Sequence, residues 1–394
     1  MTTVPRLINL VGNQRRLTEA LRVLGPSTRA DLAAATGLSR ATISATLGDL
    51  TDANLVIEPG GTTPAGPAGG RPASVVQLSR SAGVAVGVDI GRRHLKVAVA
   101  DLAHTVLAES GLRLAPNEEH TAAVMLDRAA TLVHEVLAAA GHAIPDVVGV
   151  GLGLPAPVVS STGLIGASNI LPAWSGLTPA DELSRRLSVP VCVENDANLG
   201  ALSEHLWGAG RASKSLVYLK LATGIGGGMV IDGRLFRGVS GTAGEIGHLT
   251  LDAQGDVCRC GNRGCLELVA GGTALVEVLR RTHPEVQSLP DLVRLAVAGD
   301  APCRRLVADA GSHLGVALGG MVNLVNPDLV VVGGELGSAG DVLLDPLRHA
   351  LSRSAVPSAV DAVTVVQGVL GDRAEVLGAV ALVLREGDRL PAPA

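Results

Sequence analysis

Residues 247–267, GHLTLDAQGDVCRCGNRGCLE, form a segment rich in cysteine and glycine. The chain has five cysteines in 394 residues, and three of them, Cys258, Cys260 and Cys265, fall here, with His248 ten residues before the first. Three thiolates and one imidazole satisfy a closed tetrahedral zinc site, and nearby glycines let the backbone wrap around the ion. The spacing is not that of a C-x-x-C redox pair, and the full ligand set leaves no open position for a catalytic metal. We therefore predict a structural zinc site rather than a redox device or a turn that is merely rich in cysteine.

The bulk composition indicates a globular protein of two or three compact units. A length of 394 residues exceeds one ordinary domain, and 47% hydrophobic residues suffice for a buried core. The start MTTVPRLINLVGNQRR lacks the features of a signal peptide. No apolar run approaches the roughly 20 residues of a membrane span. The clustered, odd-numbered cysteines do not suit a disulfide framework. We expect a cytoplasmic protein without a membrane partner.

Charge is distributed unevenly along the chain. The whole chain carries −5, but residues 1–80 contain eight arginines, no lysine and five acidic residues, which gives +3. The remainder is therefore −8. A small basic head on a larger acidic body is typical of a protein whose head binds nucleic acid.

The head has the pattern of a winged helix-turn-helix domain over residues 1–80. NQRRLTEALRVLG (13–25) predicts a helix that Gly25 closes. Its apolar face consists of Leu17, Ala20, Leu21 and Leu24. Thr28 with Asp31 makes a capping-box start for a second helix, which Gly37 ends, and Ser39 can cap a third. LVIE (55–58) and ASVVQLS (73–79) predict the two strands of a hairpin wing.

The third helix is the predicted DNA-recognition helix. Its inward face has Ile43, Leu47 and Leu50, and its outward face is expected to carry Arg40, Thr42, Ser44 and Thr46. Short polar side chains and one arginine suit a helix that lies in the major groove of operator DNA. Arg71, at the tip of the wing, could reach a phosphate or the minor groove. The alternative is a three-helix bundle that serves only for dimerisation or as a spacer, but the order of helix, glycine turn, polar helix and basic wing favours DNA binding.

From residue 82 onward, glycine-punctuated and β-branched segments predict an α/β body with two similar halves. The predicted strands are GVAVGVDIG (83–91), HLKVAVADL (94–102), VVGVGLGLP (147–155), PVCVEND (190–196), SLVYLKLATGIGGG (215–228) and DLVVVGGEL (328–336). Helical segments such as residues 121–141 lie between them. The plan resembles the two-lobed actin-like fold of sugar kinases and ribonuclease H-like ATPases. That resemblance implies lobe 1 over residues 81–200 and lobe 2 over residues 201–390, with the cysteine loop in lobe 2 and a C-terminal helix returning to lobe 1.

The segment GEIGHLTLD (244–252) followed by CRCGNRGCLE (258–267) closely resembles the signature of the ROK family of repressors, open reading frames and kinases. The resemblance covers about residues 10–385. The family contains bacterial sugar kinases and sugar-responsive regulators with an N-terminal winged helix-turn-helix. It implies zinc on His248, Cys258, Cys260 and Cys265, which agrees with the ligand count above.

A sugar site needs several carboxylates and amides around a ring of hydroxyl groups. The ROK resemblance implies that the matched positions line such a site between the lobes and that the aspartate is the base in the kinases. These positions are Asn169, Asn195, Asp196, Glu245, His248 and Glu267. The alternative is that they are helix caps and surface acids, which fits any one of them better than all together.

ATP chemistry is not expected, because the first phosphate loop departs from the kinase pattern. ROK kinases carry Asp-x-Gly-Gly-Thr-Lys after the first strand, where small residues let the phosphates approach the backbone. Here Asp89 and Gly91 are present, but Arg92 and Arg93 replace the Gly-Thr pair and His94 replaces the lysine. Bulky arginines would fill the space that the phosphates require. The later loops keep Thr223, Gly224, Gly226, Gly227, Gly228, Gly333 and Gly334.

We therefore predict a sugar-responsive DNA-binding transcription regulator, specifically a repressor of carbohydrate-metabolism genes, and not an enzyme. Its partners would be operator DNA, a monosaccharide or phosphorylated sugar effector, and further copies of itself in a homodimer or tetramer. The alternative is a sugar kinase with a DNA-binding head, which would need ATP and Mg²⁺ and would use Asp196 as its base. A third alternative is a silent scaffold.

Overall fold

The computed structural model describes residues 10, 12–58, 74–79, 82–114, 121–159, 162–166 and 171–386. The chain divides into two compact units. The first draws on Met1–Gly153, Pro179–Val193 and Ala379–Ala394, and the second on Leu154–Thr178 and Glu194–Gly378. Among the described residues, none of the helices combines the length and the apolar character needed to span a bilayer.

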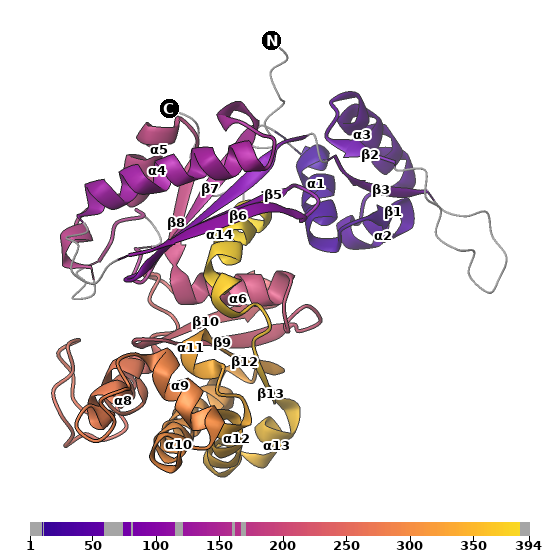
Figure 1. Cartoon of the computed structure of the whole chain (residues 1–394). Helices are drawn as coiled ribbons and strands as arrows, with labels where there is room; N and C mark the ends of the chain where they lie inside the picture. The colour runs from indigo at the N-terminus through magenta and orange to yellow at the C-terminus, as the bar shows by residue number, and fades with distance from the viewer. Residues whose placement is uncertain are drawn as a thin grey trace. The chain divides into compact units, whose positions relative to one another are not determined.

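The N-terminal part of the first unit contains three helices and a small antiparallel sheet (Figure 1). The elements are α1 (Gly12–Leu24), β1 (Ser27–Thr28), α2 (Arg29–Thr36), α3 (Arg40–Asp52), β2 (Val56–Ile57) and β3 (Val75–Leu78). The two predicted strands pair antiparallel as β2 and β3. The short strand β1, which the sequence analysis missed, pairs with the other side of β3.

Local signals set the helix ends of this part as the sequence predicts. Thr28 and Asp31 form the capping box of α2, and Gly37 ends that helix in the left-handed conformation with φ +66°. The hydroxyl of Ser39 accepts the backbone N–H of Thr42 at the start of α3. The core contains Leu17, Leu21, Leu32, Ile43, Leu47 and Leu50. Leu24 departs from the expected apolar face, because at the last position of α1 its side chain is 47% exposed.

The first unit also holds a five-stranded sheet of order β6-β5-β4-β7-β8. Its strands are β4 (Val84–Ile90), β5 (His94–Asp101), β6 (Val106–Arg113), β7 (Val147–Leu154) and β8 (Val191–Asn195). β5 lies between β4 and β6 and runs antiparallel to both, and β7 lies parallel to β4 on its other side. Helix α4 (Ala122–Ala139) packs along this sheet and against α5 (Pro179–Leu187) (Figure 1). The short helix η3 (Ile144–Asp146) leads into β7.

The second unit holds a sheet of order β11-β10-β9-β12-β13. Its strands are β9 (Ser215–Leu221), β10 (Ile225–Ile231), β11 (Arg234–Leu235), β12 (Leu329–Gly333) and β13 (Thr364–Gln367). Numbered along the chain, both five-stranded sheets have the order third, second, first, fourth, fifth, which confirms the two similar halves. Residues 215–228 form two antiparallel strands, because the chain reverses where the N–H of Ala222 donates to the carbonyl of Gly224.

The helices of the second unit include those that build most of its core. They are α6 (Asp196–Leu206), α7 (Glu267–Ala270), α8 (Gly272–Leu279), α9 (Leu289–Ala298), α10 (Ala301–Val325), α11 (Gly334–Gly337), α12 (Asp341–Ser354) and α13 (Pro357–Ala362), with the short helices η4 (Pro172–Trp174), η5 (Ile246–His248) and η6 (Gly371–Arg373). α10 meets α12 through Gly311, Gly315 and Gly319, which recur every four residues on one face. A Cβ at Gly315 would lie 2.3 Å from the carbonyl oxygen of Leu347, so only glycine permits this approach.

The last helix, α14 (Ala374–Arg385), begins in the second unit and belongs to the first unit from Ala379 onward. Its start contacts α6, where a Cβ at Gly378 would lie 2.0 Å from the carbonyl oxygen of Leu199. Its later part contacts β7, where a Cβ at Gly151 would lie 2.0 Å from the carbonyl oxygen of Ala379. Both contacts are backbone to backbone, so α14 is closely packed at each of them.

Candidate functional site

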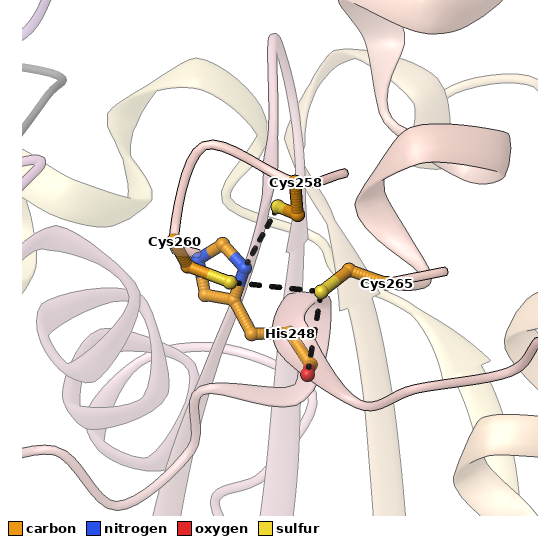
Figure 2. Close-up of side chains that lie close together, drawn as sticks. All are labelled: His248, Cys258, Cys260 and Cys265. Atoms are coloured by element: carbon orange, nitrogen blue, oxygen red, sulfur yellow. Dashed lines mark hydrogen bonds between the residues drawn. The ribbon is translucent and has the colours of Figure 1, made fainter. Parts of the chain in front are cut away.

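His248, Cys258, Cys260 and Cys265 come together in the second unit, with their ligand atoms all within 4.8 Å of one another (Figure 2). His248 Nδ1 lies 3.6 Å from Cys258 Sγ, and Cys260 Sγ lies 3.6 Å from Cys265 Sγ. Cys258 and Cys265 are buried, whereas Cys260 is exposed. One imidazole nitrogen and three sulfur atoms converge on one point, so this cluster could hold a single metal ion.

Tight backbone turns place the three sulfur atoms. The N–H of Cys258 donates to the carbonyl of Asn262 at 2.7 Å, and the N–H of Gly261 donates back to the carbonyl of Cys258 at 2.9 Å. Gly261 and Gly264 have φ values of +95° and +58°, which favour glycine. A Cβ at Gly264 would lie 1.7 Å from the carbonyl oxygen of Asp252. The glycines of the segment are therefore needed for the loop to close on itself.

The pKa values of two thiols of the cluster, Cys260 and Cys265, are shifted in opposite directions. Burial raises the pKa of Cys265 to about 12, and its hydrogen bonds with Cys260 and Cys258 act in the same direction. The pKa of Cys260 is lowered, chiefly because the backbone N–H of Asn262 donates to its sulfur. A cation at the convergence point would favour the thiolate form of all three, because a coordinating thiol loses its proton.

Glu245 lies beside the cluster, on the other side of the imidazole. Its Oε2 is 3.9 Å from His248 Nε2, so the ring presents one nitrogen to the cysteines and the other toward Glu245. The pKa of Glu245 is raised, mainly because the surrounding protein removes water from its carboxylate. Repulsion from Asp196 and Glu267 adds to that rise, and attraction to His248 and Arg259 opposes it. The carboxylates of Glu245, Asp196 and Glu267 therefore lie close enough to influence one another.

Glu267 is held by the cysteine loop itself. Arg259, between two of the cysteines, reaches the two carboxylate oxygens of Glu267 at 2.7 and 2.9 Å. The backbone N–H of Ile225 donates to the same carboxylate at 3.1 Å. Arg259 was not among the predicted site residues, although a basic residue between two ligand cysteines is a visible signal in the sequence. It fixes the position of a carboxylate that was predicted to contact sugar.

Asp196 is buried and is the first residue of α6. Its Oδ2 lies 2.8 Å from Nζ of Lys220, which also lies 3.3 Å from Oε1 of Glu375. The sequence analysis identified neither Lys220 nor Glu375 as a site residue. The available signal was a lysine inside the apolar strand LVYLKL, in a chain with three lysines in all.

Asn195 has a structural task at the start of α6. Its Oδ1 accepts the backbone N–H groups of Ala197 at 2.9 Å and Asn198 at 3.3 Å, and its Nδ2 donates to the carbonyl of Ala156 at 3.2 Å. The side chain therefore fixes the turn that presents Asp196, which matches the helix-cap alternative for this residue. Asn169 lies outside the described residues.

A buried ion pair fixes the segment that leads to Glu245. Arg237 bonds to Glu194 through its Nε, and both side chains are less than a tenth exposed. The other oxygen of Glu194 accepts the backbone N–H of Asn195 and Nδ2 of Asn198, each at 2.9 Å. This network links the end of β8, the start of α6 and the loop after β11.

A side chain of the protein itself occupies the turn after β4, where the kinase pattern has its first phosphate loop. His94 Nε2 lies 2.7 Å from Oδ2 of the buried Asp89, and the imidazole lies over Gly91, where a Cβ would be 2.2 Å from the ring. Arg92 and Arg93 are exposed. The group that fills the space next to Gly91 is thus His94 and not the two arginines.

The glycines of the later loops are explained by packing. A Cβ at Gly226 or Gly228 would lie within 3.0 Å of Ala197, and one at Gly227 would lie 2.6 Å from the carbonyl of Gly244. At Gly224 the nearest atom is a carboxylate oxygen of Glu267. Gly333 leaves room for Tyr218, and Gly334 has φ +78°. Thr223 accepts the N–H of Thr273 with its backbone carbonyl. These loops would keep their glycines with or without a nucleotide.

The exposed face of α3 differs at one position from the predicted recognition face. Arg40 and Ser44 are exposed, and the hydroxyl of the half-buried Thr42 bonds to that of Ser39 at 2.8 Å. The prediction for Thr46 was wrong, since this residue is 7% exposed. It lies three residues after Ile43 and beside Leu47, on the core stripe of the helix. Arg71 lies outside the described residues.

Comparisons with known proteins cover nearly the whole chain. Residues 85–386 match the ROK family. The xylose repressor of Bacillus spizizenii is 30% identical over 373 residues, 94% of each chain. The glucokinase of Halalkalibacterium halodurans is 33% identical over 309 residues, 74% of this chain and 92% of that one. The crystal structure of a ROK family transcriptional regulator, described as a homolog of the E. coli MLC protein, superposes with a TM-score of 0.78 at 27% identity and covers 95% of this chain and 98% of that one.

The matched segment contains the cysteine cluster and both five-stranded sheets apart from Val84, and the fold agrees with that of the regulator structure over almost its full length. The chain belongs to the ROK family.

Proposed function

We propose that the chain is a sugar-responsive DNA-binding transcription regulator, and specifically a repressor. The observation that supports the proposal most is the share of this chain that each relative matches. The xylose repressor matches 94% of this chain, whereas the glucokinase matches 74%. Likeness to the repressor thus extends over a part of the chain for which the kinase has no match. The basic charge of residues 1–80 and the exposed polar face of α3 support DNA binding by residues 1–80.

We infer that the metal of the cysteine cluster is zinc and that its role is structural. Tetrahedral zinc with Zn–S bonds of about 2.3 Å and Zn–N bonds of about 2.0 Å has S···S edges of about 3.8 Å and S···N edges of about 3.5 Å. The separations of 3.6 Å between Cys260 and Cys265 and between Cys258 and His248 are close to these values. A bound zinc ion would fix His248 through Nδ1 and leave Nε2 directed toward Glu245.

The proposed effector site comprises Asp196, Glu245, His248 and Glu267. Carboxylates that accept from sugar hydroxyl groups, together with an imidazole of fixed orientation, suit a monosaccharide. Asn195 supports the site by holding the start of α6. A sugar can alter operator affinity only through different affinities for the two states of the protein.

The proposed operator contacts include Arg40 on α3. We expect Arg40→Ala to weaken operator binding about 5- to 100-fold, the usual cost of one arginine contact. The measurement is a gel shift with DNA selected by the wild-type chain from random duplexes. Arg353→Ala is the matched control, because Arg353 is exposed on α12 and its removal changes the net charge equally. An equal loss in both variants would contradict the assignment of α3. Two heads of a homodimer or tetramer would bind half-sites about one helical turn apart or a multiple of it.

The second candidate function is an ATP-dependent sugar kinase, which the 33% identity to a glucokinase favours. The His94–Asp89 contact over Gly91 argues against it, because that is where the kinase pattern requires small residues. We expect zinc-loaded protein with ATP, Mg²⁺ and a panel of hexoses, pentoses and N-acetylated amino sugars to release no ADP above background. Turnover with one sugar, abolished by Asp196→Asn, would instead make the chain a kinase with a DNA-binding head.

A further inference from the structure

Two largely buried carboxylates of the second unit share one ammonium group. Lys220 is 14% exposed, Asp196 12% and Glu375 8%, measured on their side chains. Nζ of Lys220 lies 2.8 Å from Asp196 and 3.3 Å from Glu375. Two carboxylates and one ammonium leave this group of three with one net negative charge, so neither acidic residue has the cation to itself.

The three residues come from three elements. Lys220 is on β9, Asp196 is the first residue of α6, and Glu375 is the second residue of α14. α14 is also packed on α6 by the contact of Gly378 with the backbone of Leu199. Because α14 continues into the first unit at Ala379, Glu375 lies at the start of an element that both units share.

A shared cation makes the two ion pairs depend on each other. A buried charge that loses its partner is strongly unfavourable. Any change at one carboxylate therefore alters the strength of the ion pair between the ammonium and the other carboxylate. Lysine suits this task, since its compact charge sits on a flexible stem with three rotatable donors. A sugar hydroxyl that donates to Asp196 would take up acceptor capacity on that carboxylate and leave the ammonium more available to Glu375.

We propose that Lys220 is a positioning residue that relays the occupancy of Asp196 to the start of α14. The inference rests on the proposed function for its ligand, because Asp196 is taken as a contact of the sugar. In the relay, sugar bound at Asp196 strengthens the pair of Lys220 with Glu375 and holds the first turn of α14 more firmly. By linkage, a firmer α14 strengthens sugar binding by the same factor.

The relay is tested first without sugar, by amide hydrogen exchange of the full chain. Asp196→Asn removes one competitor for Lys220, so exchange at residues 375–379 is expected to slow about fivefold. In a Glu375→Gln background the same substitution should change that exchange less than about twofold. Glu375→Asp keeps the charge and is expected to restore part of the response, which separates loss of charge from loss of packing. Asp309→Asn, on the exposed side of α10, is the control. Equal effects of Asp196→Asn in the wild-type and Glu375→Gln backgrounds, or no effect in either, would overturn the relay.

The second part of the experiment adds D-xylose or D-glucose. In the wild type, a bound sugar is expected to slow exchange at the starts of both α6 and α14. In Glu375→Gln, only the start of α6 should respond. A response of α14 that persists in Glu375→Gln overturns the relay, while the sugar site stands. If neither sugar alters exchange in the wild type, the proposed effector site fails for these sugars, and the relay is still decided by the cycle without sugar.

Discussion

Replacing Cys265 with serine is expected to reduce bound zinc from about one per chain to below about 0.1 and to lower the free energy of unfolding of the second unit by on the order of 4 kcal/mol. Cys265 is fully buried, and its sulfur lies at the centre of the contacts among the loop residues. Serine cannot supply the thiolate. The remaining three ligands would then leave the fourth coordination position of the metal, which is buried, without a protein ligand. Metal content would be measured by plasma mass spectrometry, and stability by urea unfolding with and without added zinc.

Cys303→Ser is the matched control for that experiment. Cys303 is also fully buried, but it lies on α10 outside the cluster. This variant should lose some stability through the buried hydroxyl and yet keep its zinc. A Cys265→Ser protein that retains one zinc per chain, or a Cys303→Ser protein that loses it, would show that the ligand set is wrong.

Asp196→Asn is expected to weaken sugar binding roughly 10- to 100-fold, because a hydrogen bond to a carboxylate is worth more than one to an amide. The substitution keeps the shape of the side chain while removing the charge that Lys220 faces. Operator affinity without sugar should stay within a factor of about three, since Asp196 lies outside the DNA-binding part. Calorimetry with the effector sugar and a reporter assay of induction would measure the two effects.

Asp309→Asn provides the comparison, because this exposed aspartate on α10 is remote in sequence from the site. It should leave both sugar binding and induction unchanged. Induction by sugar that is undiminished in Asp196→Asn would exclude this carboxylate from the effector site.

The features that the sequence predicts correctly are those set by local chemistry. The capping box at Thr28, the left-handed Gly37 and the apolar strands at residues 84–90 and 147–154 depend on neighbours a few residues away. The cysteine cluster belongs with them, because its ligands are close in the chain. Strands β6, β11 and β13 of the two five-stranded sheets were missed. All three lie at the edges of their sheets, and β6 is largely exposed, so it has no apolar run to mark it.

The contacts that could not be predicted join residues far apart in the chain. Lys220 meets Asp196 across 24 residues, and the fold alone brings Glu375 to the same ammonium. Thr46 was misplaced for a different reason. Thr46 lies next to Leu47, at the edge between the buried and the exposed face of the helix. The sequence does not say on which face such a residue lies, because packing decides it.

The repeated strand order has a consequence for how the same hairpin is closed in each half of the chain. β4 and β9 are each the first strand of their sheet, each is seven residues long, and their sixth residues are Asp89 and Lys220. The hairpins that follow, β4–β5 and β9–β10, are therefore counterparts in an internally duplicated plan. In one copy the turn closes under His94, while in the other the glycines are retained by contacts with α6 and residue 244. The same hairpin is thus closed in two different ways in one chain, by a side-chain contact in the first sheet and by close backbone packing of glycines in the second.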